Sequence, residues 1–246
     1  MSRIAVVLPA YNAERTLKAT VESIPKDLNA RLILVDDASQ DGTVRSAESL
    51  GLKVVRHARN RGYGANQKTC YAEALKTDAE IVVMIHPDYQ YDARMIPALI
   101  RPIELGITDA MLGNRIRSRA EALGGGMPLY KYLANRALTI LENFYLGQNL
   151  GEFHSGMRAY SRRVLETLPW QENSDSFVFD QEFLIQLTFF KFRIGDVPVP
   201  AKYFKESSSI GFVPSAVYGT LALWTLLKYS AARLGLPARI FRRTAP

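Results

Sequence analysis

The sequence predicts an α/β protein with a mostly parallel sheet flanked by helices, followed by a C-terminal helical extension. Short apolar segments alternate with helical segments through the first half of the chain, and units of this length favour parallel strands covered by helices on both faces. Three of the apolar segments end in polar clusters, namely PAYNAE, DDASQDGT and HPDYQYD. Because ligands of such sheets bind beyond the carboxyl ends of the strands, these clusters predict a polar ligand along one sheet edge.

Four strands and the helices between them are expected in the first half of the chain. The strands are RIAVVLP at 3–9, RLILVDD at 31–37, LKVVRH at 52–57 and AEIVVMI at 79–85. Asn12 is expected to cap the first helix, and a glycine to close the second helix at 42–51. Two further helices are expected, over 66–76 and around an apolar face formed by Met95, Leu99 and Ile103.

The second half of the chain is less regular. A flexible break is expected at the three glycines 124–126, helices at 128–147 and 177–190, and a strand at 193–200. Residues 207–227 carry no charge, but Pro214 and Gly219 interrupt them, so the apolar run is shorter than the roughly 20 residues that span a bilayer. We expect one domain over residues 1–210 and an apolar and basic helical extension over 211–246.

Composition narrows the classes of protein. The single cysteine, Cys70, excludes a disulfide framework or a cysteine zinc site and favours a reducing compartment. The N-terminus reads straight into a strand, and no cleavable signal is expected. The net charge of +7 favours anionic partners such as phosphates, nucleic acid or an acidic membrane face, with a solvated basic tail as the alternative. No nucleic-acid-binding module is recognisable, so nucleic acid is not an expected partner.

Two of the polar clusters offer carboxylates to a ligand. Asp36, Asp37 and Asp41 lie within six residues and could accept hydrogen bonds from a nucleobase or a ribose, or could form an ordinary turn. Asp88 and Gln90 are two residues apart and point the same way if the segment is extended. Both oxygens could then hold Mg²⁺ or Mn²⁺ against a diphosphate; the alternative is a polar turn in which Asp92 caps a helix.

The segments VVLPAYNAERTL, LVDDASQDGT, NRGYGAN and HPDYQYD, in this order, resemble the family 2 glycosyltransferases of the GT-A fold. The resemblance is greatest to the branch of the dolichol-phosphate mannose and polyprenyl-phosphate glucose synthases. GNRI, HSGMRAYSRRVL, FVFDQEFL and VPVPAKYF extend it over roughly residues 3–210. It implies a GT-A (Rossmann-like) fold and transfer of a sugar from a nucleotide-diphospho sugar with inversion at the anomeric carbon.

The resemblance also implies roles for individual residues on the donor side. The donor-binding first loop corresponds to Pro9, Tyr11, Asn12 and Glu14. Asp36 and Asp37 correspond to the carboxylates that bind the nucleoside, with Asp37 nearest the base, and Gly62 to the glycine beside the base. Asp88 corresponds to the second, metal-binding aspartate of the family's Asp-x-Asp, and Gln90 to the glutamine after it.

His86 occupies the position of the first aspartate of that motif, which is a departure from the family pattern. A neutral imidazole can ligate Mn²⁺ but serves Mg²⁺ poorly. His86 therefore either changes the metal preference of the site or lines the pocket without ligating.

On the acceptor side, Arg115 matches a basic residue that contacts the acceptor phosphate, and Arg158 is a second candidate whose alternative is a surface arginine. His154 faces the donor or metal, or is a buried histidine with satisfied partners. Asp180 matches the residue that acts as base in many family members. A hydroxyl acceptor needs a base, whereas a phosphate acceptor is already ionised, and Asp180 would then orient or stabilise.

The sequence therefore predicts a metal-assisted inverting glycosyltransferase with Mg²⁺ or Mn²⁺, a UDP- or GDP-sugar donor and a polyprenyl phosphate acceptor. Two alternatives stay open: a soluble or polysaccharide acceptor, and a nucleotide-sugar-binding protein without turnover. The apolar residues 212–227 and the basic residues after them, from Lys228 to Arg243, predict a cytoplasmic protein peripheral at the membrane face and bound to anionic lipid. A homo-oligomer that buries the same helix is the alternative.

Overall fold

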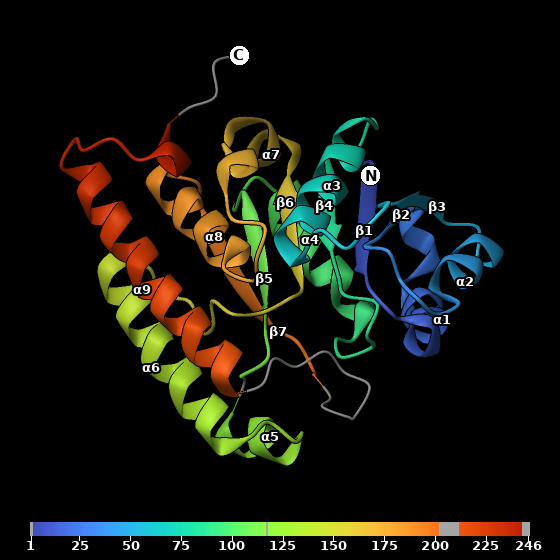
Figure 1. Cartoon of the computed structure of the whole chain (residues 1–246), viewed down its shortest axis with the longest axis horizontal. Helices are drawn as coiled ribbons and strands as arrows, with labels where there is room; N and C mark the ends of the chain where they lie inside the picture. The colour runs from blue at the N-terminus through green and yellow to red at the C-terminus, as the bar shows by residue number, and fades with distance from the viewer. Residues whose placement is uncertain (1, 117, 202–211, 243–246) are drawn as a thin grey trace.

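The computed structural model describes residues 2–116, 118–201 and 212–242, with side chains omitted for 212–216 (Figure 1). A seven-stranded sheet with the order β3-β2-β1-β4-β6-β5-β7 runs through the molecule. Its strands are β1 Ile4–Ala10, β2 Arg31–Asp36, β3 Lys53–Arg56, β4 Ile81–Met84, β5 Ala110–Asn114, β6 Arg158–Ser161 and β7 Ile194–Pro198. The predicted α/β class with a mostly parallel sheet is confirmed.

Strand β6 is the antiparallel member of the sheet and was not predicted from the sequence. It lies between β4 and β5, with Arg158 opposite Met84 on one side and Leu112 on the other. The remaining pairs are parallel. This register places the guanidinium-bearing Arg158 inside the sheet, beside the ends of β4 and β5.

One face of the sheet is covered by α1 Glu14–Ser23, α2 Thr43–Ser49 and α4 Ile96–Glu104. Their apolar residues pack with the β1 residues Ile4, Val6 and Leu8 in one core. The opposite face is covered by α3 Tyr63–Leu75, α7 Arg162–Thr167 and α8 Phe179–Phe189. Alternate β1 residues Ala5 and Val7 belong to that second core, because successive side chains of a strand point to opposite faces.

Two helix starts differ from the sequence-based expectation. Asn12 does not cap α1, because its backbone is left-handed (φ 52°) and its side chain accepts a hydrogen bond from Gln40 N instead (2.8 Å). Helix α3 begins at Tyr63, three residues before the expected start at residue 66. Asp92 caps a helix, as the alternative reading of its segment has it, since its carboxylate accepts from Arg94 N at the start of the short helix η2 Ala93–Met95.

The C-terminal half adds α5 Arg119–Gly124, α6 Leu129–Leu146 and α9 Phe212–Arg233. The glycines 124–126 end α5 in a turn in which Gly125 N bonds to Glu121 O (2.8 Å), so the expected break lies between α5 and α6, and its flexibility stays a prediction. Helix α9 runs unbroken through Pro214 and Gly219, so the expected interruption is wrong. Within the described part of the chain, no helix has the length and apolarity to cross a bilayer.

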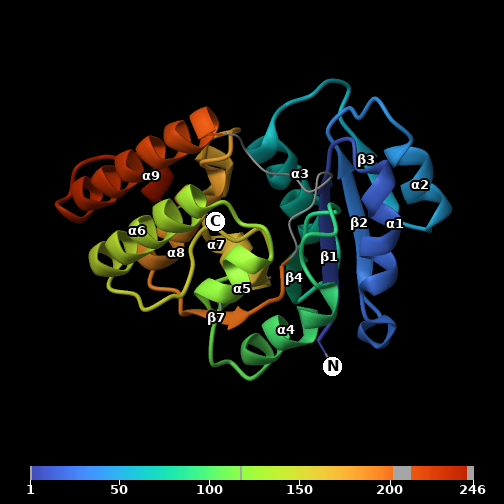
Figure 2. The ribbon, with the colours of Figure 1, turned by 90° about the horizontal axis from the view of Figure 1, so that it is seen from below.

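Helices α6 and α9 lie side by side at one end of the molecule (Figures 1 and 2). Leu226 and Tyr229 of α9, and Ile240 and Phe241 of the short helix η4 Arg239–Phe241, pack in the same core as α8. The extension is therefore joined to the sheet domain by apolar contact. The division at residue 210 falls in 202–211, outside the described residues, and stays a prediction.

Candidate active site

The three polar clusters lie next to one another because the strands that precede them are neighbours in register. Ala10 of β1 pairs with Asp36 of β2, and Val7 of β1 pairs with Met84 of β4. All three strands are parallel, so their carboxyl ends open on the same edge of the sheet. The sequence-based expectation of one polar edge is met by this register.

Asp37 is buried and holds the loop that leads into α3. Its carboxylate accepts from Arg61 N (2.9 Å) and Gly62 N (3.0 Å), and it lies 2.7 Å from His57 Nδ1. Gly62 has φ 96°, and a Cβ there would approach Asp175 O to 2.8 Å. Glycine is therefore required at position 62 both for its backbone conformation and for the close approach of the 173–177 loop.

Asp36 is fully buried at the end of β2. Its Oδ2 accepts from Ser39 N (3.1 Å) and lies 3.7 Å from the exposed Arg56 Nε. Its Oδ1 has no hydrogen-bond partner among the described residues. Because an unsatisfied buried acceptor is costly, this oxygen is suited to receive a donor from a bound ligand.

The first loop and the aspartate-rich loop bind each other. Glu14 Oε2 accepts from Gly42 N (2.9 Å), and Asp41 Oδ2 accepts from Glu14 N (3.1 Å). Residues of both loops, including Asn12, Glu14 and Asp41, line an open pocket of about 500 Å³. Tyr11 is 53% exposed, whereas Pro9 is buried within β1, where it pairs with Val35.

Residues 86–92 form a turn, not the extended segment that the sequence predicted. Tyr89 is left-handed (φ 55°), and Asp88 Oδ1 accepts from Gln90 N (3.1 Å). Helix α1 holds the turn, because Thr16 Oγ1 donates to Pro87 O (2.6 Å) and Thr20 Oγ1 accepts from Tyr89 N (3.1 Å). The expected alignment of the Asp88 and Gln90 side chains along an extended strand is therefore wrong, although the turn still places both residues at the sheet edge.

The Tyr63 hydroxyl links His86 to Asp180. It lies 3.0 Å from His86 Nε2 and donates to Asp180 Oδ2 (2.7 Å). Burial lowers the pKa of His86 below its usual value of 6.5, and the carboxylates of Asp88 and Asp180 oppose that shift. The His86 ring also lies against Gly156, where a Cβ would come within 2.5 Å of the ring Cδ2.

Asp180, in the first turn of α8, is surrounded by protein donors. Gln67 Nε2 donates to Oδ1 (2.9 Å), and Arg158 Nη1 lies 3.1 Å from the same oxygen. Arg158 is 1% exposed, so it is not a surface arginine. Burial by itself would lower the pKa of its guanidinium, but Asp180 and the neighbouring tyrosines outweigh burial and raise the pKa.

Arg115 is held from three sides after β5. Glu152, which is fully buried, accepts from Arg115 N (2.8 Å) and from its guanidinium, and His154 O accepts from Nη2 (2.7 Å). Asn135 of α6 donates to Glu152 Oε1 (2.9 Å), the oxygen that also accepts from the Arg115 guanidinium. Burial opposes ionisation of Glu152, but the Arg115 charge and hydrogen bonds outweigh it and lower the pKa of this carboxyl.

The His154 ring faces α6 and α9. Its Nδ1 lies 2.9 Å from Tyr218 Oη, and its Nε2 lies 3.3 Å from Glu142 Oε2. Both oxygens of the buried Glu142 lack a hydrogen bond among the described residues. The structure thus places His154 in a buried polar cluster between helices: Nδ1 lies at hydrogen-bonding distance from Tyr218, whereas Nε2 lies near the Glu142 carboxylate without a hydrogen bond among the described residues.

The Asp88–Gln90 turn offers one carboxylate and one amide, which are oxygen donors of the kind that Mg²⁺ and Mn²⁺ take. No group of three or more histidine, cysteine, aspartate or glutamate side chains suited to a metal occurs in the described ranges. Magnesium commonly uses one or two protein carboxylates and takes its other ligands from phosphates and water. The donor set therefore fits a cation shared with a diphosphate.

Three residues that complete this constellation were not predicted: Tyr63, Gln67 and Glu152. Tyr63, Gln67 and Tyr71 stand four residues apart on α3, and Tyr71 Oη donates to Gln67 Oε1 (2.8 Å). That spacing aligns side chains along one helix face, so the NRGYGANQK segment did carry a signal for the pair that binds Asp180.

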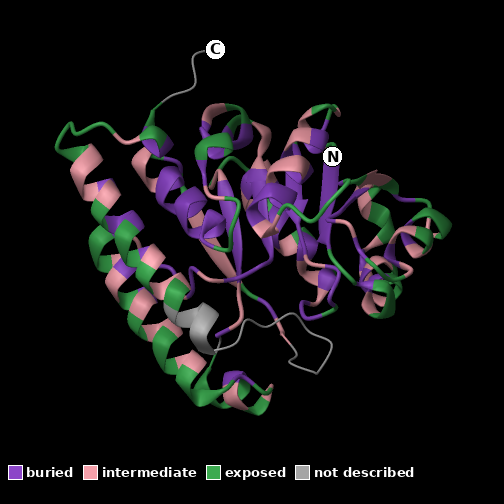
Figure 3. Ribbon diagram, viewed as in Figure 1, coloured by how far each residue is buried: buried purple, intermediate pink, exposed green. Residues whose placement is uncertain are grey.

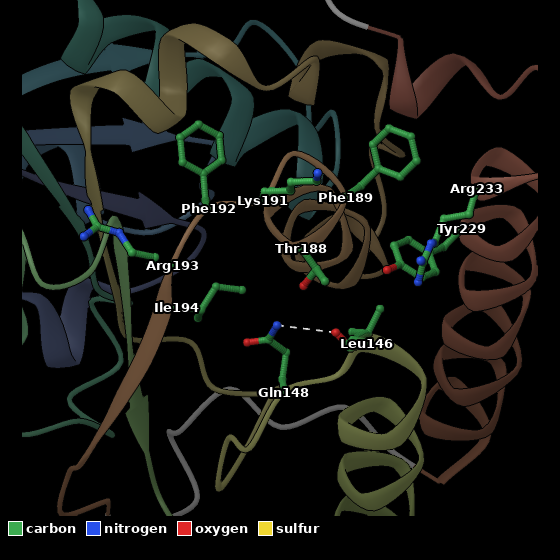
Figure 4. A pocket seen from close by; sticks show the side chains of 10 residues that line it. All are labelled: Leu146, Gln148, Thr188, Phe189, Lys191, Phe192, Arg193, Ile194, Tyr229 and Arg233. Carbon is green, nitrogen blue, oxygen red and sulfur yellow. Dashed lines mark hydrogen bonds between the residues drawn. The ribbon is translucent and has the colours of Figure 1, made fainter. Parts of the chain in front are cut away.

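A second cavity, of about 700 Å³, lies between the C-terminal ends of α6 and α8, the start of β7 and α9 (Figure 4). Lys191, Arg193 and Arg233 line it together with apolar side chains. Arg193 is bound to Asp109 (2.9 Å). None of the residues in the constellation around Asp88 and Asp180 lines this cavity.

The sheet order, the acidic strand ends and the buried Asp180 cluster define an α/β enzyme that binds a polar ligand across the carboxyl edge of its sheet. The family described as Glycosyl transferase family 2 matches residues 5–168. The chain belongs to this family and is a glycosyltransferase acting on a nucleotide sugar.

Curated relatives cover most of the chain. The UDP-N-acetylglucosamine–dolichyl-phosphate N-acetylglucosaminyltransferase of Methanococcus voltae is 28% identical over 225 residues, covering 85% of this chain and 89% of that protein. A dolichyl-phosphate hexose transferase of Haloferax volcanii is 29% identical over 198 residues, covering 80% and 82%. These names agree with the branch of the family that the sequence resembles.

Solved structures show the same fold. Glucosyl-3-phosphoglycerate synthase of Mycobacterium tuberculosis in complex with UDP has a TM-score of 0.70 at 24% identity, covering 96% of this chain and 82% of that one. Its complex with Mn²⁺, UDP-glucose and phosphoglyceric acid has a TM-score of 0.68 at 22% identity, covering 96% and 81%. The predicted GT-A fold is confirmed.

Proposed function

We propose that this enzyme transfers a sugar, with inversion, from a UDP- or GDP-sugar to a polyprenyl phosphate. The choice of acceptor rests on the environment of Asp180. Its carboxylate oxygens already accept hydrogen bonds from Tyr63 and Gln67 and form an ion pair with Arg158. A base for a hydroxyl acceptor must reach the proton that it removes. An ionised phosphate needs no base, so Asp180 in this setting serves to position its neighbours. The dolichyl-phosphate acceptors in the names of two relatives support the same choice.

On the donor side, Asp36 and Asp37 bind the nucleoside, and Gly62 lies beside the base. The unpartnered Asp36 Oδ1 supports this role, because a ribose hydroxyl or a base N–H would satisfy it. The first loop, with Pro9, Tyr11, Asn12 and Glu14, borders the donor through the pocket that Asn12 and Glu14 line.

Asp88 and Gln90 hold Mg²⁺ or Mn²⁺, which when bound supplies charge stabilisation to the departing diphosphate. His86 lines the pocket beside them: its Nε2 is directed to Tyr63. The complex of glucosyl-3-phosphoglycerate synthase with Mn²⁺ and UDP-glucose, a protein of the same fold, supports a divalent cation.

On the acceptor side, Arg115 contacts the phosphate, with its guanidinium oriented by Glu152 and the His154 carbonyl. Arg158 is bound to Asp180 and three carbonyl oxygens. It would reach a phosphate only if the pair with Asp180 opened. We place the protein peripherally at the cytoplasmic face of a membrane, where α9 and the basic residues after it contact anionic lipid. A homo-oligomer that buries α9 is the alternative.

A transfer assay tests the acceptor. The purified protein is incubated with a panel of UDP- and GDP-sugars, Mg²⁺ or Mn²⁺, and a polyprenyl phosphate in detergent, with a soluble sugar as the competing acceptor. Labelled sugar is expected in the lipid phase. Label that stays in an aqueous product would favour a soluble or polysaccharide acceptor. Donor binding without any transfer would favour a nucleotide-sugar-binding protein.

A further inference from the structure

The outer side of α6 is an exposed apolar stripe. Tyr130, Leu133, Ala137, Ile140 and Phe144 are spaced i, i+3, i+7, i+10 and i+14, which places them on one side of the helix. Ile140 is 62% exposed and Phe144 is 84% exposed. The opposite side carries the buried Thr139, Glu142 and Leu146. A contiguous apolar surface of this kind marks an interaction site.

Helix α9 continues this surface. Val217, Leu223, Trp224 and Leu227 are between 42% and 56% exposed, whereas Ala222, Leu226 and Tyr229 on its other side are buried. Since α6 and α9 lie side by side and each buries its inner side, both stripes face away from the sheet (Figures 1 and 3). We call the two stripes together the apolar face.

The two segments that carry the apolar face have charges that are almost all positive. Residues 129–146 and 212–242 contain six basic residues and one carboxylate. That carboxylate, Glu142, is fully buried, whereas Arg233, Arg239 and Arg242 are exposed. Apolar side chains in segments of net positive charge are typical of helices that lie in the surface of an anionic bilayer.

We propose that the apolar face docks on an anionic lipid bilayer with α6 in its surface. A second copy of this chain is the less suitable occupant, because two-fold packing would place two positively charged surfaces against each other, with no exposed carboxylate in the described parts of these two segments to offset the charge. An anionic bilayer can bury the apolar residues among its acyl chains while its negative headgroups attract the cationic residues.

Docking through α6 would set the height of the acceptor site above the lipid. The inner side of α6 carries Asn135, which bonds to Glu152, and Glu152 in turn holds Arg115. An α-helix with its side chains is about 10 Å across. If the proposed function holds, an acceptor phosphate needs to rise by only about that distance to reach Arg115, while its hydrocarbon tail stays in the bilayer.

Vesicle sedimentation tests the proposal on the whole protein. The wild type is expected to bind vesicles that contain about one part in three phosphatidylglycerol, to bind neutral phosphatidylcholine vesicles far less, and to be released by salt. Ile140→Glu and Phe144→Glu, made separately, are expected to lower the partition coefficient at least about tenfold each. Ile107→Glu is the matched control, because Ile107 is 61% exposed and lies in the loop between α4 and β5; it should bind as the wild type does.

A water-soluble short-chain isoprenyl phosphate separates this proposal from the proposed function. Ile140→Glu is expected to keep wild-type transfer to the soluble acceptor, which shows that it is folded, and to lose transfer to a long-chain acceptor held in vesicles. If the wild type transfers sugar to neither acceptor, the proposed function is overturned. Lipid docking is then still supported by the sedimentation result. Docking is overturned if both glutamate variants sediment as Ile107→Glu does. It is also overturned if the wild type does not bind anionic vesicles at low salt; a dimer that Ile140→Glu dissociates would then identify a second copy as the occupant.

Discussion

Replacing Asp180 by asparagine should destabilise the protein through Arg158. The guanidinium of Arg158 is 1% exposed, and Asp180 Oδ1 at 3.1 Å is its charged partner. The carbonyl acceptors that remain are Ser155 O at 2.7 Å and two more distant ones, Asp180 O at 3.4 Å and Phe153 O at 3.5 Å. Removing one member of a buried ion pair costs about 3–5 kcal/mol. We expect about 3 kcal/mol, since the asparagine oxygen can still accept a hydrogen bond.

The assay is thermal unfolding followed by tryptophan fluorescence, in which the buried Trp170 reports on the core. A loss of about 3 kcal/mol corresponds to a fall in melting temperature of roughly 6–12 °C for a chain of this size. Asp109→Asn is the control, because it breaks an aspartate–arginine pair of similar length (2.9 Å) in which Arg193 is 55% exposed. Exposed pairs contribute about 1 kcal/mol or less.

A loss below about 1 kcal/mol in Asp180→Asn, equal to that of Asp109→Asn, would refute the reasoning from burial. A second variant checks the cause. Asp180→Leu combined with Arg158→Met removes both charges, and it should be more stable than Asp180→Asn because no unpaired charge remains in the core.

Four further predictions concern the edge of the sheet. Asp88→Ala should lower the transfer rate at least about a hundredfold and remove the metal dependence of donor binding, as measured by calorimetry with and without Mn²⁺; near-normal metal-stimulated turnover would contradict the assignment. Tyr63→Phe removes the hydroxyl that binds both His86 and Asp180, so kcat should fall about tenfold with the KM for the donor unchanged, whereas a change confined to KM would argue for a donor contact. Because burial lowers the pKa of His86 below 6.5, its neutral form stabilises the fold fully above pH 6.5, and that contribution is lost as the pH falls toward the lower pKa of the folded state; His86→Gln should flatten this part of the unfolding profile, and an unchanged profile would refute the reasoning. In His86→Asp, titration with Mg²⁺ and Mn²⁺ should show a shift toward Mg²⁺ if His86 is a ligand and no shift if it only lines the pocket.

The sequence was sufficient for the parallel strands β1 to β4, for β7 and for the polar edge of the sheet. Strands β1, β2 and β4 are apolar runs bounded by turn residues, and such runs predict buried strands. Strand β6 could not be found in this way, because it is four residues long and begins with Arg158. An arginine in a short segment argues for the surface, and only the partner on α8, Asp180, makes its burial tolerable.

Positions that depend on backbone conformation were also beyond the sequence. Asn12 reads as a helix cap by residue type, yet its left-handed backbone directs the side chain to Gln40. Tyr89 has a positive φ, and few residues other than glycine adopt that conformation. The motifs therefore located Asp88 and Gln90 correctly at the edge of the sheet, while the prediction of how their side chains align was wrong.

The contact between His86 and Gly156 constrains how this sequence can have changed over time. A methyl group at position 156 would come within 2.5 Å of the imidazole Cδ2, so with His86 in this orientation only glycine fits at that position. While histidine occupies position 86, we expect substitutions of Gly156 to be disfavoured. The two positions, 70 residues apart in the chain, should therefore covary. Among related sequences, a residue larger than glycine at 156 should accompany a side chain smaller than histidine at 86.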